Sequence, residues 1–356
     1  MNPIELKLFA SRLQSICDEM GGVLQRSAFS PNIKDRLDFS CAVFAPNGEL
    51  ASQAAHIPVH LGSMAYTMQA LVATQAWQPG DMLVINDPYL GGTHLPDVTL
   101  LAPVFRADST EPQIVGFVAN RAHHANIGCE TPGSMPLSNT IEEEGVLIPP
   151  TLLLRDGKFQ SCGAKIDALL FDRPGVLSGD FAAQLGATLL TVDRLQGLVE
   201  SYGAELYSSA LTAVNDYGRR LSLAALGEIA GGIYSAEDFL DDDGFGGEGL
   251  ALRVSIEISE AGISYDFTES SDQVRGNLNC PESVAAAAAY YCHCCLLPVG
   301  APLCAGLFKD LKILTRKPSI VNPAFPAAVA AGNLQDSNGG SFTYTFKASD
   351  GVNILS

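Results

Sequence analysis

Two hairpin signals near the start of the chain constrain its fold more than any other feature of the sequence. In "DFSCAVFAPNGELASQ", the turn Pro46-Asn47-Gly48 separates two apolar runs, which is the pattern of a β-hairpin. Further along, the apolar runs Asp97 to Arg106 and Gln113 to Arg121 are joined by the polar "ADSTEP". We expect these two runs to be antiparallel neighbours in a sheet.

Helical patterns surround these hairpins and indicate the fold class. Near the N-terminus, apolar residues recur every three or four positions, which predicts an amphipathic helix: Leu6, Phe9, Leu13, Ile16, Met20 and Val23. "SMAYTMQALVATQ" predicts a second helix, and residues 179–234 have helical spacing without proline. A further hairpin around Glu260-Ala261-Gly262 precedes a helix in "PESVAAAAAYYCHCCLL". This mixture predicts an α+β fold rather than regular βαβ alternation.

The length of the chain favours two domains or subdomains of about 150 residues each. We expect residues 1–175 to contain the β-hairpins and a mixed sheet, together with the candidate site described below. We expect residues 176–356 to contain a helical segment around residues 180–234, followed by the further hairpin and helix.

Charge, cysteine content and hydropathy limit the classes of partner and compartment. Lys and Arg total 21 against 39 Asp and Glu, and the formal net charge of −18 disfavours nucleic-acid binding. The nine cysteines are an odd number in apolar contexts, so we expect free thiols in a reducing, cytoplasmic setting. The N-terminal residues are charged where a signal peptide is apolar. His293 and Pro298 interrupt the longest uncharged stretch, so we expect no membrane association.

The histidines are unevenly distributed, which suggests a shared site. Between residues 56 and 124 lie five of the six: His56, His60, His94, His123 and His124. If the second hairpin is centred near residue 109, Asp97 faces roughly residue 122, and His94 reaches the sheet end that carries the adjacent histidines. The first hairpin brings Asp38 opposite roughly residue 57, beside His56. This arithmetic leaves open whether the two strand ends meet.

Imidazole and carboxylate groups together suit a divalent metal such as zinc, iron or manganese, which could activate water or polarise a carbonyl oxygen. Two other interpretations stay open. His56 and His60 can be hydrogen-bonded core residues, and His94 to Asp97 can be a turn capped by its own aspartate. The sequence contains no phosphate-binding Gly-x-x-x-x-Gly-Lys loop and no Gly-x-Ser-x-Gly elbow, so it predicts neither an ATP site nor a serine hydrolase.

Segments spread in order over most of the chain carry a family resemblance: "RLDFSCAVF", "HIPVHLGSM", "GDMLVINDPYLGGTHLPDVTLLAPVF", "NRAHHANIG", "YDFTESSDQVRGNLN" and "NPAFPAAVAAGN". They resemble the hydantoinase B/oxoprolinase family, which includes the B components of N-methylhydantoinase, the C-terminal part of 5-oxoprolinase and the α-subunit of acetone carboxylase. The resemblance implies a hetero-oligomer in which a hydantoinase A-type, ATP-binding partner phosphorylates the substrate.

The resemblance also implies a metal centre in this chain. By motif, its ligands are Asp38, His94, Asp97 and one histidine of the adjacent pair, for which we favour His123. The ion would be a divalent metal, with zinc, iron and manganese all compatible with these ligands.

Four further residues are candidates for catalysis by the same resemblance. His60 or His124 would move protons, although His60 could instead orient a ligand. Asn120 and Arg121 would hold a phosphate or a carboxylate, although Arg121 could instead pair with an acidic residue.

The implied reaction is hydrolysis of a cyclic amide such as a hydantoin, 5-oxoproline or another lactam. Resonance makes the carbonyl carbon of a lactam a poor electrophile, and phosphorylation of its oxygen creates a good leaving group. Water activated by a metal then attacks near neutral pH. The alternatives are a ketone-carboxylating α-subunit of the acetone carboxylase type and an inactive, truncated remnant.

Two departures from the family pattern affect these expectations. "HHANIGC" has Asn126 and Cys129 where the family usually has Asp and Gly, which removes a charge. The chain ends at Ser356, earlier than is usual in the family, and its tail "SFTYTFKASDGVNILS" does not carry the resemblance. We therefore expect the C-terminal part of the family fold to be missing.

Overall fold

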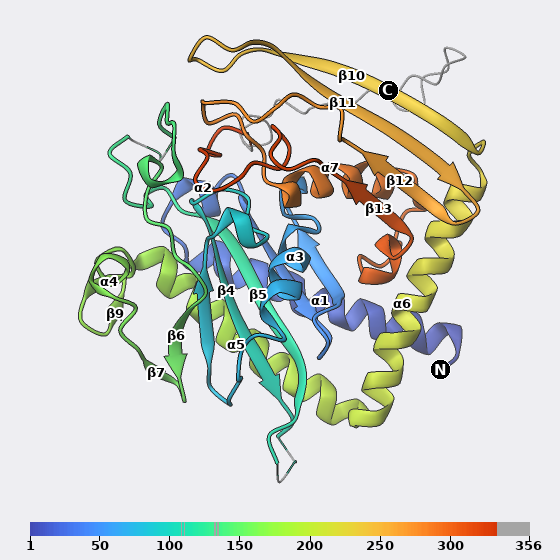
Figure 1. Ribbon diagram of the computed structural model, residues 1–356. Helices are drawn as coiled ribbons and strands as arrows, with labels where there is room; N and C mark the ends of the chain where they lie inside the picture. Colours follow the sequence, from blue (N-terminus) through green and yellow to red (C-terminus); the bar gives the residue numbers. More distant parts are fainter. Residues whose placement is uncertain (108, 110, 132, 134, 333–356) are drawn as a thin grey trace.

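A seven-stranded sheet forms the centre of the structure, with the strand order β2-β1-β5-β4-β3-β6-β7 (Figure 1). The computed structural model describes residues 1–107, 109, 111–131, 133 and 135–332. Every neighbouring pair in this sheet is antiparallel. The strands are β1 (Phe39–Phe44), β2 (Leu50–Ala55), β3 (Met82–Ile85), β4 (Asp97–Phe105), β5 (Ile114–His123), β6 (Thr151–Arg155) and β7 (Lys158–Phe159).

Helices cover both faces of this sheet and connect it to the second part of the chain (Figure 1). Among them, the N-terminal helix starts with a capping box, in which Asn2 and Glu5 each accept a hydrogen bond from the other's backbone N–H. The helices are α1 (Pro3–Ser27), α2 (Pro31–Lys34), α3 (Ser63–Leu71), α4 (Ala164–Leu170), α5 (Gly179–Tyr202), α6 (Ala204–Gly227) and α7 (Glu282–Cys295).

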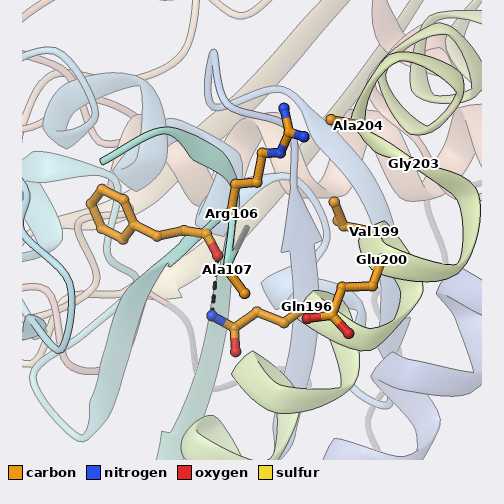
Figure 2. Close-up of a pocket in the computed structure, with 8 residues that line it drawn as sticks. Arg106, Ala107, Gln196, Val199, Glu200, Gly203 and Ala204 are labelled. Atoms are coloured by element: carbon orange, nitrogen blue, oxygen red, sulfur yellow. Dashed lines mark hydrogen bonds between the residues drawn. The ribbon is translucent and has the colours of Figure 1, made fainter. Parts of the chain in front are cut away.

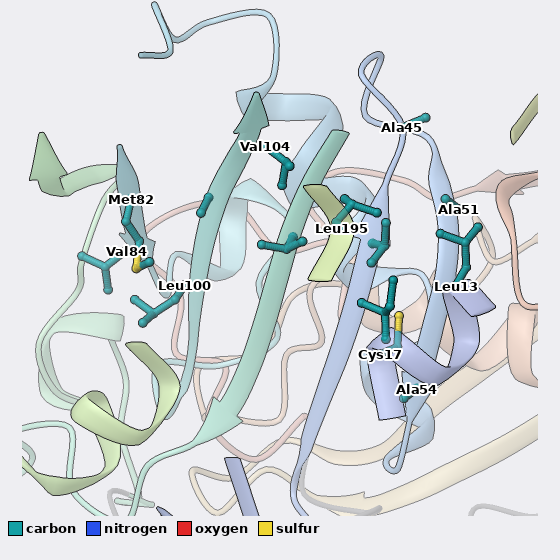
Figure 3. Packing of buried hydrophobic residues seen from close by; sticks show 14 of the residues in the cluster. Leu13, Cys17, Ala45, Ala51, Ala54, Met82, Val84, Leu100, Val104 and Leu195 are labelled. Atoms are coloured by element: carbon teal, nitrogen blue, oxygen red, sulfur yellow. The ribbon is translucent and has the colours of Figure 1, made fainter. Parts of the chain in front are cut away.

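The strands have continuous apolar runs because side chains on both faces of the sheet are buried. All residues of β4 are buried. Alternate side chains, such as Val98 and Val118, pack in one cluster with Leu13 of α1 and Leu195 of α5. Figure 3 shows this side of the sheet, with Leu13 and Leu195 approaching the strands. The opposite face, which includes Phe117, packs against α3.

A second sheet, β10-β11-β12-β13, lies in the C-terminal half of the chain. Its side chains Val254 and Tyr265 pack with Leu226 of α6 and Ala289 of α7. The alanine-rich α7 is thus a packing helix, and its buried residues include His293. The strands are β10 (Gly232–Asp242), β11 (Glu248–Ser259), β12 (Gly262–Asp266) and β13 (Leu311–Leu314), and a two-stranded sheet contains β8 (Phe171–Arg173) and β9 (Val176–Leu177).

The expected α+β class is confirmed, as are the hairpins and the predicted helices. We expected the sheet that carries the site to be mixed, but it is antiparallel throughout. It consists of hairpins and of neighbouring strands that also pair antiparallel. The mixed sheet is the second one, in which β12 and β13 are parallel. We expected a boundary between two domains or subdomains at residue 175. One apolar cluster includes both Val98 and Leu195, so it contains residues on both sides of that position.

One helix boundary and one connecting region differ from the sequence analysis. The helical segment ends at Gly227 instead of continuing to residue 234, because Gly232 begins β10, which pairs along its length with β11. Between residues 151 and 173, short strands and the helix α4 occur where the sequence analysis predicted no element. The tail from residue 341 onwards lies outside the described residues. Within the described residues, no helix combines the length and apolarity that a bilayer crossing requires.

Candidate metal centre

The expected metal-site residues gather at one end of the seven-stranded sheet. Asp97, the first residue of β4, is paired directly with His123, the last residue of β5. On the other side of β5, Phe39 of β1 pairs with Ala122, and the backbone N–H of His123 donates to the carbonyl of Asp38 at 3.0 Å. The pairing of β1 with β5 therefore brings Asp38 to the same sheet end.

The strand register determines which of the two adjacent histidines reaches the cluster. Asp97 faces His123 rather than residue 122 because the pairing of β4 with β5 shifts between Val104 and Phe105. This bulge places one extra residue on β5 near the loop. Since side chains alternate along a strand, His123 shares a face with Asp97, whereas His124 points to the other face and stacks on α5.

Donor atoms from His94, Asp97 and His123 have the spacing of ligands around one ion, and Asp38 approaches His123. Nε2 of His94 lies 3.2 Å from Nδ1 of His123 and 3.4 Å from Oδ1 of Asp97. Nδ1 of His123 lies 3.4 Å from that same oxygen and 3.5 Å from Oδ2 of Asp38. For comparison, tetrahedral metal bonds of about 2.1 Å place neighbouring ligand atoms about 3.4 Å apart.

A buried oxygen without a hydrogen-bond donor supports the fit of a cation. Asp97 is 1% exposed, and its Oδ1 has no hydrogen-bond partner in the described part of the chain. A buried, unsatisfied carboxylate oxygen is destabilising, and a divalent cation at this position would satisfy it. Two groups of residues that share Asp97 are able to hold an ion: His94, Asp97 and His123, and Asp38, His60 and Asp97.

The hydrogen bond to His94 indicates which of its nitrogens is free for a metal. The carbonyl of Ala330 lies 3.2 Å from Nδ1 of His94. Because a carbonyl only accepts hydrogen bonds, Nδ1 carries the proton and Nε2 keeps its lone pair. That lone pair belongs to the atom that faces His123 and Asp97, as metal ligation requires.

His60 and Thr93 fix the orientation of the Asp97 carboxylate. Nε2 of His60 lies 3.2 Å from Oδ2 of Asp97, and the hydroxyl of Thr93 donates to the same oxygen. An ionised carboxylate only accepts, so His60 donates from Nε2, and its Nδ1 accepts from the hydroxyl of Ser40 at 3.1 Å. These contacts hold Oδ2 and leave Oδ1 facing the other two imidazoles.

The two carboxylates of the cluster have opposite pKa shifts. Burial and the nearby charge of Asp97 raise the pKa of Asp38. Burial acts in the same direction on Asp97, but the imidazoles of His94 and His60 outweigh it and hold the Asp97 pKa well below its usual range. Of the two carboxylates, Asp97 therefore stays ionised to lower pH than Asp38.

The cluster is most exposed on one side. His60 and Asp97 are at most 1% exposed, whereas Asp38 is 6% and His123 is 7% exposed. Asp38 and His123 are therefore the least buried residues of a cluster that is buried throughout.

The sequence profile described as hydantoinase B/oxoprolinase matches residues 2–340. The chain belongs to this family. The 5-oxoprolinase of Saccharomyces cerevisiae is 36% identical over 94% of this chain and 27% of that protein. The 5-oxoprolinase 1 of Arabidopsis thaliana is 35% identical over 93% of this chain and 28% of that protein. The family resemblance of the sequence motifs is confirmed, and the chain spans only part of each relative.

Solved structures show the same fold in other proteins. The ATP-dependent caprolactamase from Pseudomonas jessenii has a TM-score of 0.85 and 25% identity, over 95% of this chain and 58% of that chain. Nucleotide-free acetone carboxylase has a TM-score of 0.80 and 18% identity, over 93% of this chain and 46% of that chain. The second likeness is evidence for the fold alone.

In this family member, Arg121 lies on the same strand face as His123 but is bound by neutral groups. Its guanidinium donates to the hydroxyls of Thr99 (2.9 Å), Ser63 (2.7 Å) and Thr67 (3.0 Å), and to the carbonyl of Gly91 (3.3 Å). These partners are not acidic, so the alternative expectation of a direct ion pair is wrong for the described residues. Burial lowers the Arg121 pKa to about 10, still far above neutral pH.

Asn120 and His124 lie on the opposite face of the sheet, beneath α5, and do not reach the cluster. Gln184 of α5 donates to Asn120 at 2.8 Å and accepts from Nε2 of His124 at 2.8 Å. The His124 ring also stacks on Phe181, with 3.9 Å between the ring centroids. Desolvation lowers its pKa to about 4. These two residues therefore connect α5 to the sheet.

Other residues from the sequence analysis lie outside the cluster. His56 is exposed, and its ring contacts the edge of Phe39 at 4.7 Å between centroids. Asn126, the departure from the family pattern, is also exposed and accepts a hydrogen bond from Gly128 within a turn. The change at this position therefore alters none of the donor atoms in the cluster.

Sequence reasoning missed several residues that hold the ligands in place. Ser40 and Thr93 adjoin the motifs that carry Asp38 and His94, but their hydroxyls gave no separate signal. Ala330 contributes a backbone carbonyl, which side-chain patterns do not reveal. Its segment stood out only as part of the family resemblance.

A separate pocket lies at the opposite end of β4 (Figure 2). It is lined by the strand end at Phe105 and by α5, and Gln196 bridges these elements through a 3.1 Å hydrogen bond to the Phe105 carbonyl. Because β4 begins at Asp97 and ends at Phe105, this pocket is not part of the metal-ligand cluster.

Proposed function

We propose that this chain is the metal-bearing B-type component of an ATP-dependent cyclic amidase. In this proposal, a hydantoinase A-type partner uses ATP to activate a lactam, and this chain catalyses its hydrolysis. The observation that carries the proposal is the set of donor atoms from His94, Asp97, His123 and Asp38, with Oδ1 of Asp97 lacking any donor among the described residues. The 36% sequence identity to a 5-oxoprolinase and the fold shared with caprolactamase support a cyclic amide as the class of substrate.

When bound, a divalent metal such as zinc, iron or manganese would lower the pKa of water and polarise a carbonyl oxygen. His94, Asp97, His123 and Asp38 would hold it. His60 would keep the Asp97 carboxylate in orientation through its Nε2 proton instead of carrying protons to the substrate. The substrate would enter beside Asp38 and His123, the more exposed edge.

Arg121 remains in the proposal as a fixed positive charge on the face that carries the site. Four of its five N–H groups are already engaged, so it would attract an anionic substrate mainly through charge. The catalytic assignment does not extend to Asn120 and His124, because α5 holds both on the other face.

Reconstitution with the partner tests this function. The chain would be co-purified with a hydantoinase A-type subunit and given ATP with 5-oxoproline, hydantoin or caprolactam. We expect lactam-dependent ATP hydrolysis and a ring-opened product, both lost in His94→Ala and Asp97→Asn. Glu142→Gln, at an exposed carboxylate, is the matched control and should stay active.

The same experiment separates the alternatives. Bicarbonate-dependent consumption of acetone without lactam opening would assign the carboxylase function. A chain that folds and pairs with its partner but contains no metal and turns over neither substrate would be an inactive remnant.

A further inference from the structure

Glu144 is a buried carboxylate that the metal-ligand set does not include. It follows the 3-10 turn at 141–143 and is 0% exposed. Its Oε1 accepts hydrogen bonds from the hydroxyl of Ser138 at 2.7 Å and from the backbone N–H groups of Val329 and Ala330, both at 2.9 Å. Three donors to one oxygen stabilise a charge that burial alone would disfavour.

The same backbone segment supports a metal ligand. The carbonyl of Ala330, whose N–H binds Glu144, accepts the Nδ1 proton of His94 at 3.2 Å. Glu144 and His94 are 50 positions apart in the sequence, but a single residue links them through its two backbone polar groups. This link continues to Nε2 of His94, the atom that faces the other ligands.

Other contacts keep this segment in place, so the carbonyl of Ala330 has a defined position. The hydroxyl of Tyr89 donates to the Ala327 carbonyl at 2.6 Å, and the Asn279 amide donates to the Ala328 carbonyl at 3.0 Å. Glu144 binds the next two residues. Its carboxylate is the only charged side chain among these three partners, all of which belong to the described residues.

We propose that Glu144 is a positioning residue for the metal ligand His94, acting through the backbone of Val329 and Ala330. This inference rests on the proposed metal centre. The partner of the second imidazole nitrogen fixes the ring orientation and the basicity of a metal-ligating histidine, and its loss typically weakens metal binding about 10- to 100-fold. Glu144 holds that partner in place.

Cobalt binding tests this role without relying on activity. The full chain would be stripped of metal and titrated with Co²⁺ against a chromophoric chelator, and its visible ligand-field spectrum would be recorded. We expect Glu144→Ala to weaken Co²⁺ binding about 10-fold and to change the spectrum, because the backbone N–H groups of Val329 and Ala330 lose their acceptor and His94 loses its fixed orientation. Glu142→Ala is the matched control, since Glu142 lies two residues away with an exposed side chain.

Folding effects are separated from positioning by a second variant and by melting of the metal-free protein. Ser138→Ala removes one donor to Oε1 but keeps the carboxylate, and we expect about a 3-fold loss of Co²⁺ affinity. If Glu144→Ala folds and binds Co²⁺ with unchanged affinity and spectrum, the inference is overturned. If Glu144→Ala does not fold, unchanged affinity in Ser138→Ala overturns it instead.

The control outcome with the unmodified chain distinguishes the two proposals. If the wild-type chain binds no Co²⁺, the proposed metal centre itself fails, and the role of Glu144 fails with it. If the wild-type chain binds Co²⁺ but Glu144→Ala binds it equally well, only the role of Glu144 fails.

Discussion

Asp97 and His123 face each other across β4 and β5, and Oδ1 of Asp97 lies 3.4 Å from Nδ1 of His123. The next residue, His124, points to the other face of the sheet and binds Gln184 of α5. Two adjacent histidines therefore have different environments, because successive side chains of an extended strand alternate in direction.

This relationship predicts different effects of substituting the two histidines. We expect His123→Ala to weaken metal binding by more than about 100-fold. The substitution removes a proposed ligand itself, which costs more than removing a residue that only orients a ligand. His124→Gln should keep the metal but lower stability, since the stacking on Phe181 is lost. Metal content after gel filtration, measured by mass spectrometry, checks both. Loss of metal from His124→Gln with full occupancy in His123→Ala would contradict the assignment.

Substitution of His60 tests whether the cluster binds one ion or two. With one ion, His60→Gln removes only the orientation of Asp97, and we expect about a 10-fold loss of affinity at an unchanged stoichiometry of one. Equilibrium dialysis with a metal assay gives both quantities. A wild-type stoichiometry of two that falls to one in His60→Gln would instead assign Asp38, His60 and Asp97 to a second ion.

Removal of the metal should lower the thermal stability of the protein. A ligand that binds only the folded state at 100 times its dissociation constant stabilises that state by about 2.7 kcal/mol. We expect EDTA to lower the melting temperature of the metal-loaded wild type by several degrees, and to leave that of Asp97→Asn unchanged. Differential scanning fluorimetry with and without EDTA measures this. An equal shift in both proteins would show that the stabilising metal binds elsewhere.

His293 should contribute to the pH dependence of stability, as should His124, whose pKa burial also lowers to about 4. His293 of α7 is buried and contacts the hydroxyl of Ser222 on α6 at 2.8 Å. Desolvation lowers its pKa to about 4, against a usual value of 6.5. The unfolded state therefore takes up a proton before the folded state does, so stability is present above pH 6.5 and is lost as the pH falls towards 4.

The expected size of this loss at pH 5 is about 2 kcal/mol. Urea unfolding of metal-free protein at pH 7.5 and pH 5.0 measures it in the wild type and in His293→Gln. The variant should lose less stability between the two pH values, because its residue 293 does not titrate. Equal losses in both proteins would exclude His293 as a contributor.

Local pairing made part of the site predictable from the sequence. The hairpin signal around residue 109 brought Asp97 and His94 to the strand end that carries the adjacent histidines. It could not select between the two histidines, because the bulge between Val104 and Phe105 shifts the register by one residue. That bulge depends on contacts within the folded sheet, and no turn motif in the sequence predicts it.

The fold class was predictable for a similar reason, and its errors have a physical cause. Periodicity identified the long helices and the hairpins, since each depends on spacing within one segment. It failed at β10, where residues after Gly227 pair with β11 instead of extending the helix. Strand pairing overrides local preference here, and the short elements before Pro174 were too brief to have a period.

The sequence by itself determined the concentration of histidines between residues 56 and 124, the His94 to Asp97 spacing at the start of a strand, and the family. Those features are local or depend on the order of motifs along the chain. Only the tertiary structure decided that β1 lies beside β5, which brings the expected residue Asp38 to the same sheet end, and that Ala330 and Glu144 support His94. These contacts join residues far apart in the sequence, so they arise from the packing of the whole core and not from any single segment.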